Sequence, residues 1–72
     1  MQEVPLRTEY ITLGQLLKLV GEVNSGGEVK DYLAVETPIV NGEEEVRRGR
    51  KLRDGDVIYL RGVGELRCVA LN

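Results

Sequence analysis

The sequence has no histidine, tryptophan or phenylalanine, and it contains a single cysteine. Without histidine, the chain alone cannot form a Cys-His zinc site, or a Ser-His or Cys-His pair for nucleophilic catalysis. Carboxylates are plentiful, but no two of them form a recognisable acid-base pair. We therefore expect a protein that is not an enzyme and that holds no metal and no cofactor.

Long apolar runs are absent as well. No run approaches the roughly 20 apolar residues of a membrane-spanning helix, and the polar N-terminus of mixed charge is unlike a signal peptide. One cysteine excludes an internal disulfide, which agrees with a reducing cytosol. The length predicts one domain over residues 1–72 with a small core. We expect a cytoplasmic protein with no membrane partner, in which Cys68 is a buried small hydrophobe.

Positive charge is concentrated in one segment of a chain whose net charge is −2. Within this segment, the basic loop (residues 46–56), the basic residues are Arg47, Arg48, Arg50, Lys51 and Arg53. Such a cluster costs self-repulsion, and a polyanion is its natural partner. Gly49 favours a loop, and Leu52 is its apolar anchor. On charge alone, a solvated loop that only maintains solubility is an equally good interpretation.

Hydrophobic periodicity predicts a short strand and then a helix. Residues 3–8 alternate as a strand, and Pro5 favours an edge position. The helix begins at Thr12, which can form a capping box with Gln15, and Gly21 ends it. Its buried face is formed by Leu13, Leu16, Leu17 and Val20.

A second helix follows Ser25, the predicted N-cap, and Glu28 completes a second capping box. This helix ends before Pro38. Gly26 and Gly27 occupy its first turn although glycine is a poor helix former. Two explanations remain open. The glycines could let a phosphate rest on the free helix N–H groups, or they could serve tight packing or a flexible entry turn.

The second half of the chain predicts strands. Residues 39–40 and 43–46 flank an Asn41-Gly42 hairpin turn, and further strands cover 57–60 and 66–71. The run Glu43, Glu44 and Glu45 is expected to be a solvated face. The whole order predicts an α+β fold, with two N-terminal helices packed on one side of a small, mostly antiparallel sheet.

The order and spacing of these motifs resemble the RNA-binding domain first seen in ribosomal protein S-four. The resemblance covers about residues 10–60 and rests on residues 12–18, the helix led by Ser25, Val40-Asn41-Gly42 and Gly55-Asp56-Val57. Within that superfamily, the sequence is similar to small stand-alone bacterial proteins of the YaaA type. The resemblance implies a helix-helix-hairpin surface, an αL-type motif, that binds structured RNA, often ribosomal RNA, without catalysis.

Carried over by position, the resemblance implies a set of RNA-binding residues. They are Lys18, Ser25, Gly26, Gly27, Lys30, Arg47, Arg48, Arg50, Lys51 and Arg53. The sequence departs from the family pattern in three places. Gly26 stands where many members have arginine, residues 34–39 lack the usual glycine, and Glu44 replaces an apolar residue whose packing Val46 is expected to supply.

Three functions are compared. The leading interpretation is a monomer that binds structured RNA, expected to be ribosomal RNA, in ribosome assembly or maturation. The lack of Phe and Trp argues against base stacking, although Tyr10, Tyr32 and Tyr59 leave it open. The alternative is a protein-protein adaptor whose acidic surface docks a basic ribosomal protein or an RNA-modifying enzyme. A sulfur-carrier-like domain would need a C-terminal Gly-Gly, but this chain ends Ala70-Leu71-Asn72.

Overall fold

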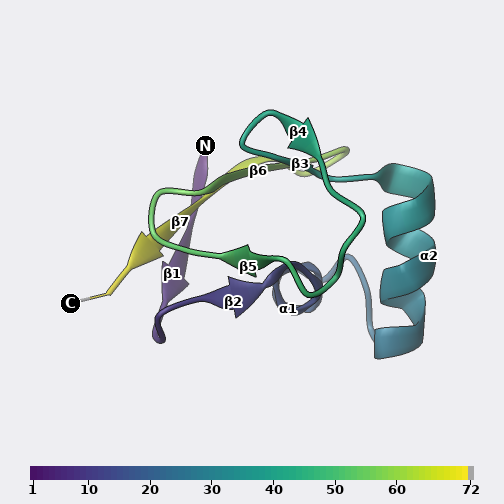
Figure 1. Cartoon of the computed structure of the whole chain (residues 1–72), viewed down its shortest axis with the longest axis horizontal. Helices are drawn as coiled ribbons and strands as arrows, with labels where there is room; N and C mark the ends of the chain where they lie inside the picture. The colour runs from purple at the N-terminus through teal and green to yellow at the C-terminus, as the bar shows by residue number, and fades with distance from the viewer. Residues whose placement is uncertain (72) are drawn as a thin grey trace.

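The computed structural model describes residues 1–71 of the chain. Two short helices lie between strands that come from both ends of the sequence (Figure 1). In chain order the elements are β1 (Gln2–Leu6), β2 (Ile11–Thr12), α1 (Leu13–Leu19), α2 (Gly26–Glu36), β3 (Ile39–Val40), β4 (Glu43–Glu44), β5 (Lys51–Leu52), β6 (Val57–Leu60) and β7 (Gly64–Ala70).

Five of the strands form the main sheet, in the order β1-β7-β6-β3-β4. The β1–β7 pair is parallel and the other pairs are antiparallel. Strand β1 lies at the edge, as Pro5 predicts. The α+β class and the mostly antiparallel sheet therefore agree with the sequence prediction.

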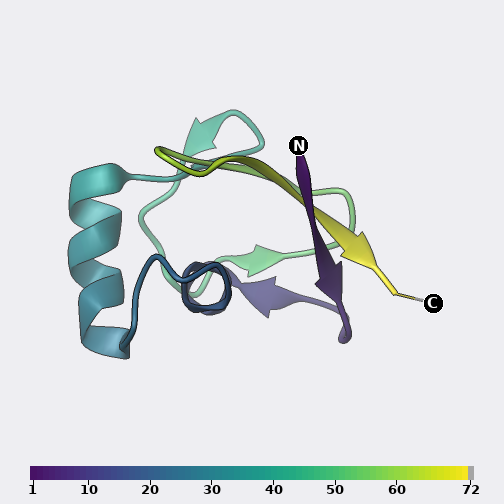
Figure 2. The ribbon, with the colours of Figure 1, turned by 180° about the vertical axis from the view of Figure 1, so that it is seen from behind.

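Two features of the predicted fold need correction. The predicted first strand is present as β1, but a second short strand, β2, also precedes the helices, and the sequence prediction did not include it. In addition, β2 pairs with β5 as a separate two-stranded sheet, so residues 51–52 of the basic loop are a strand. Figures 1 and 2 show α1 end-on beneath the main sheet, whereas α2 stands at one end of the molecule.

Helix α1 begins and ends as its sequence predicts. The backbone N–H of Thr12 donates to Gln15 Oε1 at 2.8 Å, and the N–H of Gln15 donates to Thr12 Oγ1 at 3.2 Å, which completes the capping box. At the other end Gly21 has a φ of +81°. The N–H groups of Gly21 and Glu22 donate to carbonyls of the last turn, the pattern of a glycine-terminated helix.

Helix α2 begins after Ser25 as predicted, but the second capping box is wrong, because the Ser25 side chain accepts no hydrogen bond from the helix. The helix ends at Thr37, next to Pro38. Thr37 adopts a φ of 39°, a conformation that usually favours glycine. Its hydroxyl donates to the Leu33 carbonyl at 3.1 Å. Thr37 thus makes the turn for which the family commonly uses glycine.

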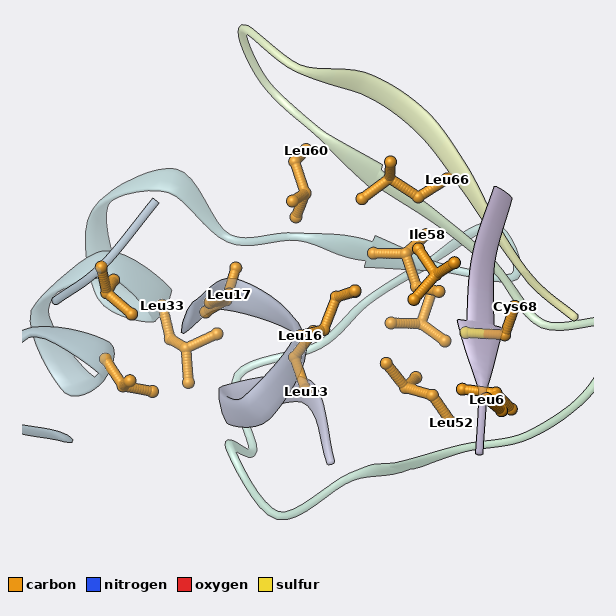
Figure 3. Close-up of a cluster of buried hydrophobic side chains, with 14 residues drawn as sticks. Leu6, Leu13, Leu16, Leu17, Leu33, Leu52, Ile58, Leu60, Leu66 and Cys68 are labelled. Carbon is orange, nitrogen blue, oxygen red and sulfur yellow. The ribbon is translucent and has the colours of Figure 1, made fainter. Parts of the chain in front are cut away.

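The core lies between α1 and the main sheet (Figure 3). Leucines of α1 point toward Ile58, Leu60 and Leu66 of the sheet, and Leu52 closes the same cluster as the predicted anchor of the basic loop. Val20 is only partly buried. Cys68 is fully buried as expected, and burial raises the pKa of its thiol to about 11.

The β3–β4 hairpin is attached to the turn after the basic loop. Asn41 and Gly42 both have positive φ, 49° and 86°, as a two-residue type I′ turn requires. The Asn41 side chain donates to Asp56 Oδ1 at 3.0 Å and accepts from the Val57 N–H at 2.9 Å. These two bonds explain why Val-Asn-Gly and Gly-Asp-Val, distant in sequence, occur together.

Candidate nucleic-acid interface

The basic loop is fixed to the N-terminal end of α1. Figure 1 shows that the segment joining β4 to β5 runs on the side where α2 lies and reaches α1 before β5. There the N–H of Leu13 donates to the Arg50 carbonyl at 2.8 Å, and the N–H of Gly14 donates to the Arg48 carbonyl at 2.9 Å. A Cβ on Gly14 would lie 3.4 Å from that Arg48 oxygen. A side chain at residue 14 would thus touch the loop, and the two hydrogen bonds give the loop backbone a defined position.

Glu45 corrects the expectation of a solvated acidic run. Glu43 and Glu44 are exposed, but Glu45 is only 6% exposed. Its carboxylate accepts hydrogen bonds from the backbone and the guanidinium of Arg47 and from Arg50 Nη1, each at 3.0 Å. Hydrogen bonds from the Arg47 side chain are the main reason that the pKa of Glu45 falls to about 2. One carboxylate thus binds two of the five basic residues of the loop and offsets one of their two positive charges.

Lys51 and Arg53 lie against Tyr10, a contact that the sequence did not predict. Lys51 Nζ is 4.9 Å from the centre of the Tyr10 ring, and the Arg53 guanidinium carbon is 5.3 Å from it. Both distances are typical of cation–π contacts. Arg53 also pairs with Glu9 at 3.3 Å. The contact depends on the pairing of β2 with β5, which brings residues 11–12 beside residues 51–52 and which local sequence patterns do not reveal.

The other two tyrosines have different environments. Tyr32 is half-buried beside the core, as its helical spacing predicts, and its hydroxyl donates to Glu22 at 3.3 Å. Burial and the Glu22 carboxylate raise the pKa of Tyr32 to about 12. Tyr59 is 43% exposed on β6.

A groove of about 290 Å³ lies between α1, the start of α2 and the basic loop. It is lined by Thr12, Gly14, Gln15, Lys18, Gly26, Val29, Arg48 and Gly49. A Cβ on Gly26 would meet nothing within 4 Å, and one on Gly27 would meet only Ser25 Oγ at 3.9 Å. Tight packing therefore does not explain these glycines, and the first turn of α2 is open to a ligand.

The ten residues implied by the resemblance separate into groups. Lys18, Gly26 and Arg48 meet at the groove, where Ser25 and Gly27 flank Gly26. Lys30 and Arg48 line a second hollow, which lies between α2 and the segment that follows β4. Arg47 and Arg50 bind Glu45, and Lys51 and Arg53 contact Tyr10. Within residues 1–71, the side chains of Lys18, Lys30 and Arg48 form no ion pair.

Val46 does not take over the packing that Glu44 lacks. Its side chain is 62% exposed, so this part of the sequence prediction was wrong.

No group of three or more His, Cys, Asp or Glu residues in the described part of the chain could hold a metal ion. No helix among these residues is long and apolar enough to cross a membrane.

A compact helix pair, a hairpin with Asn-Gly at its turn and a fixed basic loop define the class of this protein. The model of the S4 domain matches residues 4–67, and the chain belongs to this family. The chain is 46% identical over 66 residues to the "Probable ribosome maturation protein RlbA" of Bacillus subtilis (strain 168). That match covers 92% of this chain and 93% of the relative. No solved structure gives a significant match. The family resemblance drawn from the sequence is thereby confirmed.

Proposed function

We propose that this protein binds structured RNA, with ribosomal RNA as the target, and acts without catalysis in ribosome assembly or maturation. It would do so as a cytoplasmic monomer folded as one domain. Membership of the S4 domain family and similarity to a relative named as a ribosome maturation protein support the proposal. The observation that carries it is the placement of three cations that form no ion pair within residues 1–71. Lys18 and Arg48 line the groove at the open start of α2, and Lys30 lies with Arg48 at the second hollow.

The binding would be mainly electrostatic and geometric. Each lysine or arginine that neutralises a phosphate releases a counterion, so affinity falls as salt rises. The first N–H groups of a helix have no partner within the helix, and they point at any anion placed before it. Ser25 leaves those groups of α2 without a side-chain cap, and Gly26 places no side chain in front of them. Double-stranded RNA is read through such contacts by its shape.

Contact with a basic ribosomal protein is the second candidate. The observation in its favour is that β4 is an edge strand whose two residues, Glu43 and Glu44, are both exposed. This surface is separate from the groove. It would allow the protein to contact RNA and a basic protein of the ribosome together, and a pure adaptor would use it alone.

The test is a salt titration of RNA binding, measured by fluorescence anisotropy with a labelled, fully paired RNA hairpin and with fragments of ribosomal RNA. Replacing Lys18 and Arg48 together by alanine should weaken binding and flatten the plot of log K against log salt by about 1.4 to 1.8, for two phosphates. Arg67→Ala is the matched control, because Arg67 is an exposed cation on β7 outside the groove.

The control should keep the wild-type slope. A double variant that also keeps this slope would refute the assignment of the groove. A wild-type protein that binds neither RNA would support the adaptor function instead.

A further inference from the structure

The second hollow lies next to the groove. It has a volume of about 480 Å³ and lies between α2 and the segment that follows β4. Three of its lining residues, Leu33, Ala34 and Val46, are apolar, and the other two, Lys30 and Arg48, are cationic. Arg48 lines both the hollow and the groove, so an extended ligand could occupy both.

Val46 is held in its exposed position by the residues on both sides of it. The N–H of Glu45 donates to the Pro38 carbonyl at 2.9 Å, and the N–H of Arg47 donates to the Glu45 carboxylate at 3.0 Å. Valine itself has a stiff side chain. A single exposed apolar residue needs no explanation. Here, however, the stiff side chain of Val46 lines the same hollow as two cations and an exposed alanine of α2.

The charges decide which occupant fits. An apolar segment of a protein would fill the hollow but would leave Lys30 and Arg48 without a counter-charge. An unstacked nucleobase has apolar faces and is joined to phosphates on both sides. Bases that leave a helix are commonly bound on side-chain surfaces, including the plane of an arginine guanidinium.

We propose that this hollow receives one unstacked base of the bound RNA, with its neighbouring phosphates on Lys30 and Arg48. The proposal rests on the proposed function and adds that the target is a helix with a bulge or loop at the contact. The base faces Val46, Leu33 and Ala34, while the adjoining helix lies along the groove.

The test compares two RNA hairpins, one fully paired and one carrying a single bulged 2-aminopurine. The wild-type protein should bind the bulged hairpin about fivefold or more tightly, the factor expected if the base buries about 40 Å² of apolar surface at about 25 cal/mol per Å². The 2-aminopurine fluorescence should change as the complex forms. Val46→Ser removes two methyl groups and should reduce the preference for the bulge by about threefold or more.

Val35→Ser is the matched control, because Val35 is also largely exposed (73%, against 62% for Val46) and lies on α2 but does not line the hollow. Ala34→Gln is a second variant that fills the hollow with a polar chain and keeps both the charge and a good helix former. It should also reduce the preference, whereas Val35→Ser should keep it. Thermal unfolding of each variant establishes that it is folded.

Two outcomes overturn the proposal while leaving RNA binding intact. One is equal, salt-dependent binding of both hairpins by the wild type, which a hollow for a peptide would give. The other is the same preference in Val46→Ser and Val35→Ser. A wild-type protein that binds neither hairpin overturns the proposed function together with the base site.

Discussion

Replacing Glu45 by glutamine tests how the interface is organised. The variant keeps the size of the side chain and one oxygen that can accept the Arg47 N–H. It removes the negative charge that Arg47 and Arg50 share. Two effects of opposite sign should follow. The free energy of unfolding should fall, and the salt dependence of RNA binding should steepen, because two guanidinium groups become available to phosphates.

The size of the stability loss follows from the environment of Glu45. A pKa lowered from the ordinary 4.5 to about 2 corresponds to roughly 3 kcal/mol at about 1.36 kcal/mol per pKa unit. The Arg47 side chain is 72% exposed, so solvent screening reduces this figure to about 1–2 kcal/mol. For a domain of this size, each kcal/mol lowers the melting temperature by about 4–8 °C.

The pH dependence gives an independent check of the sign. Because folding lowers the pKa of Glu45, its contribution is fully present above the ordinary pKa of 4.5 and is lost as pH falls toward 2. The stability difference between wild type and Glu45→Gln should therefore be constant near neutral pH and shrink steadily below pH 4.5.

Urea unfolding at several pH values measures this difference, and Glu44→Gln is the matched control. Glu44 is the preceding residue and is exposed, so its variant should stay within about 0.5 kcal/mol of wild type. Equal stability of the two variants at neutral pH would refute the role of Glu45. A difference that does not change between pH 5 and pH 3 would refute the electrostatic explanation.

Three further predictions follow from packing and local geometry. Leu17→Ala should lower the free energy of unfolding by roughly 2–5 kcal/mol, measured with urea, because Leu17 is fully buried. In the same assay Arg50→Ala, which leaves Glu45 with one partner fewer, should lower it by only about 1 kcal/mol. Gly27→Ala should keep or raise the melting temperature of the wild type, since the added methyl group has room and alanine is the better helix former. The same variant should bind RNA more weakly in the anisotropy assay, and an affinity equal to that of the wild type would show that Gly27 is purely structural. Asn41→Ala should cost about 1–3 kcal/mol in urea, because it leaves the Val57 N–H without its partner and places alanine at positive φ; an unchanged midpoint would show that these bonds contribute nothing.

Local signals predicted most of the fold because each depends on neighbours in the sequence. The Thr12 capping box, the Gly21 stop and the Asn41-Gly42 turn all involve residues within about four positions of each other. The β2–β5 pair could not be predicted in this way. It joins Ile11 to Leu52 through only two residues on each strand, too few to show a period.

The same distinction applies to the candidate site. The resemblance identified Lys18, Gly26 and Arg48, and the structure brings them to one groove. It could not identify Glu45, because three consecutive glutamates have the same composition whichever of them is buried. Glu45 follows strand β4, and its N–H donates to the Pro38 carbonyl opposite it, while its carboxylate is the one of the three that binds the arginines.

Charge counted along the sequence therefore overstates the positive field of the basic loop. Five basic residues would give about five phosphate contacts if each were free. Glu45 holds the guanidinium groups of Arg47 and Arg50 and offsets one of their two charges before any RNA binds, and the exposed Arg53 is weakly paired with Glu9. These ion pairs reduce the self-repulsion that a bare cluster would bring. It leaves Arg48, together with Lys18 and Lys30 from the helices, as the cations around the groove and the hollow. The specificity of the interface would then come from where these three charges stand, and a salt slope nearer to three phosphate contacts than to five is the expected consequence.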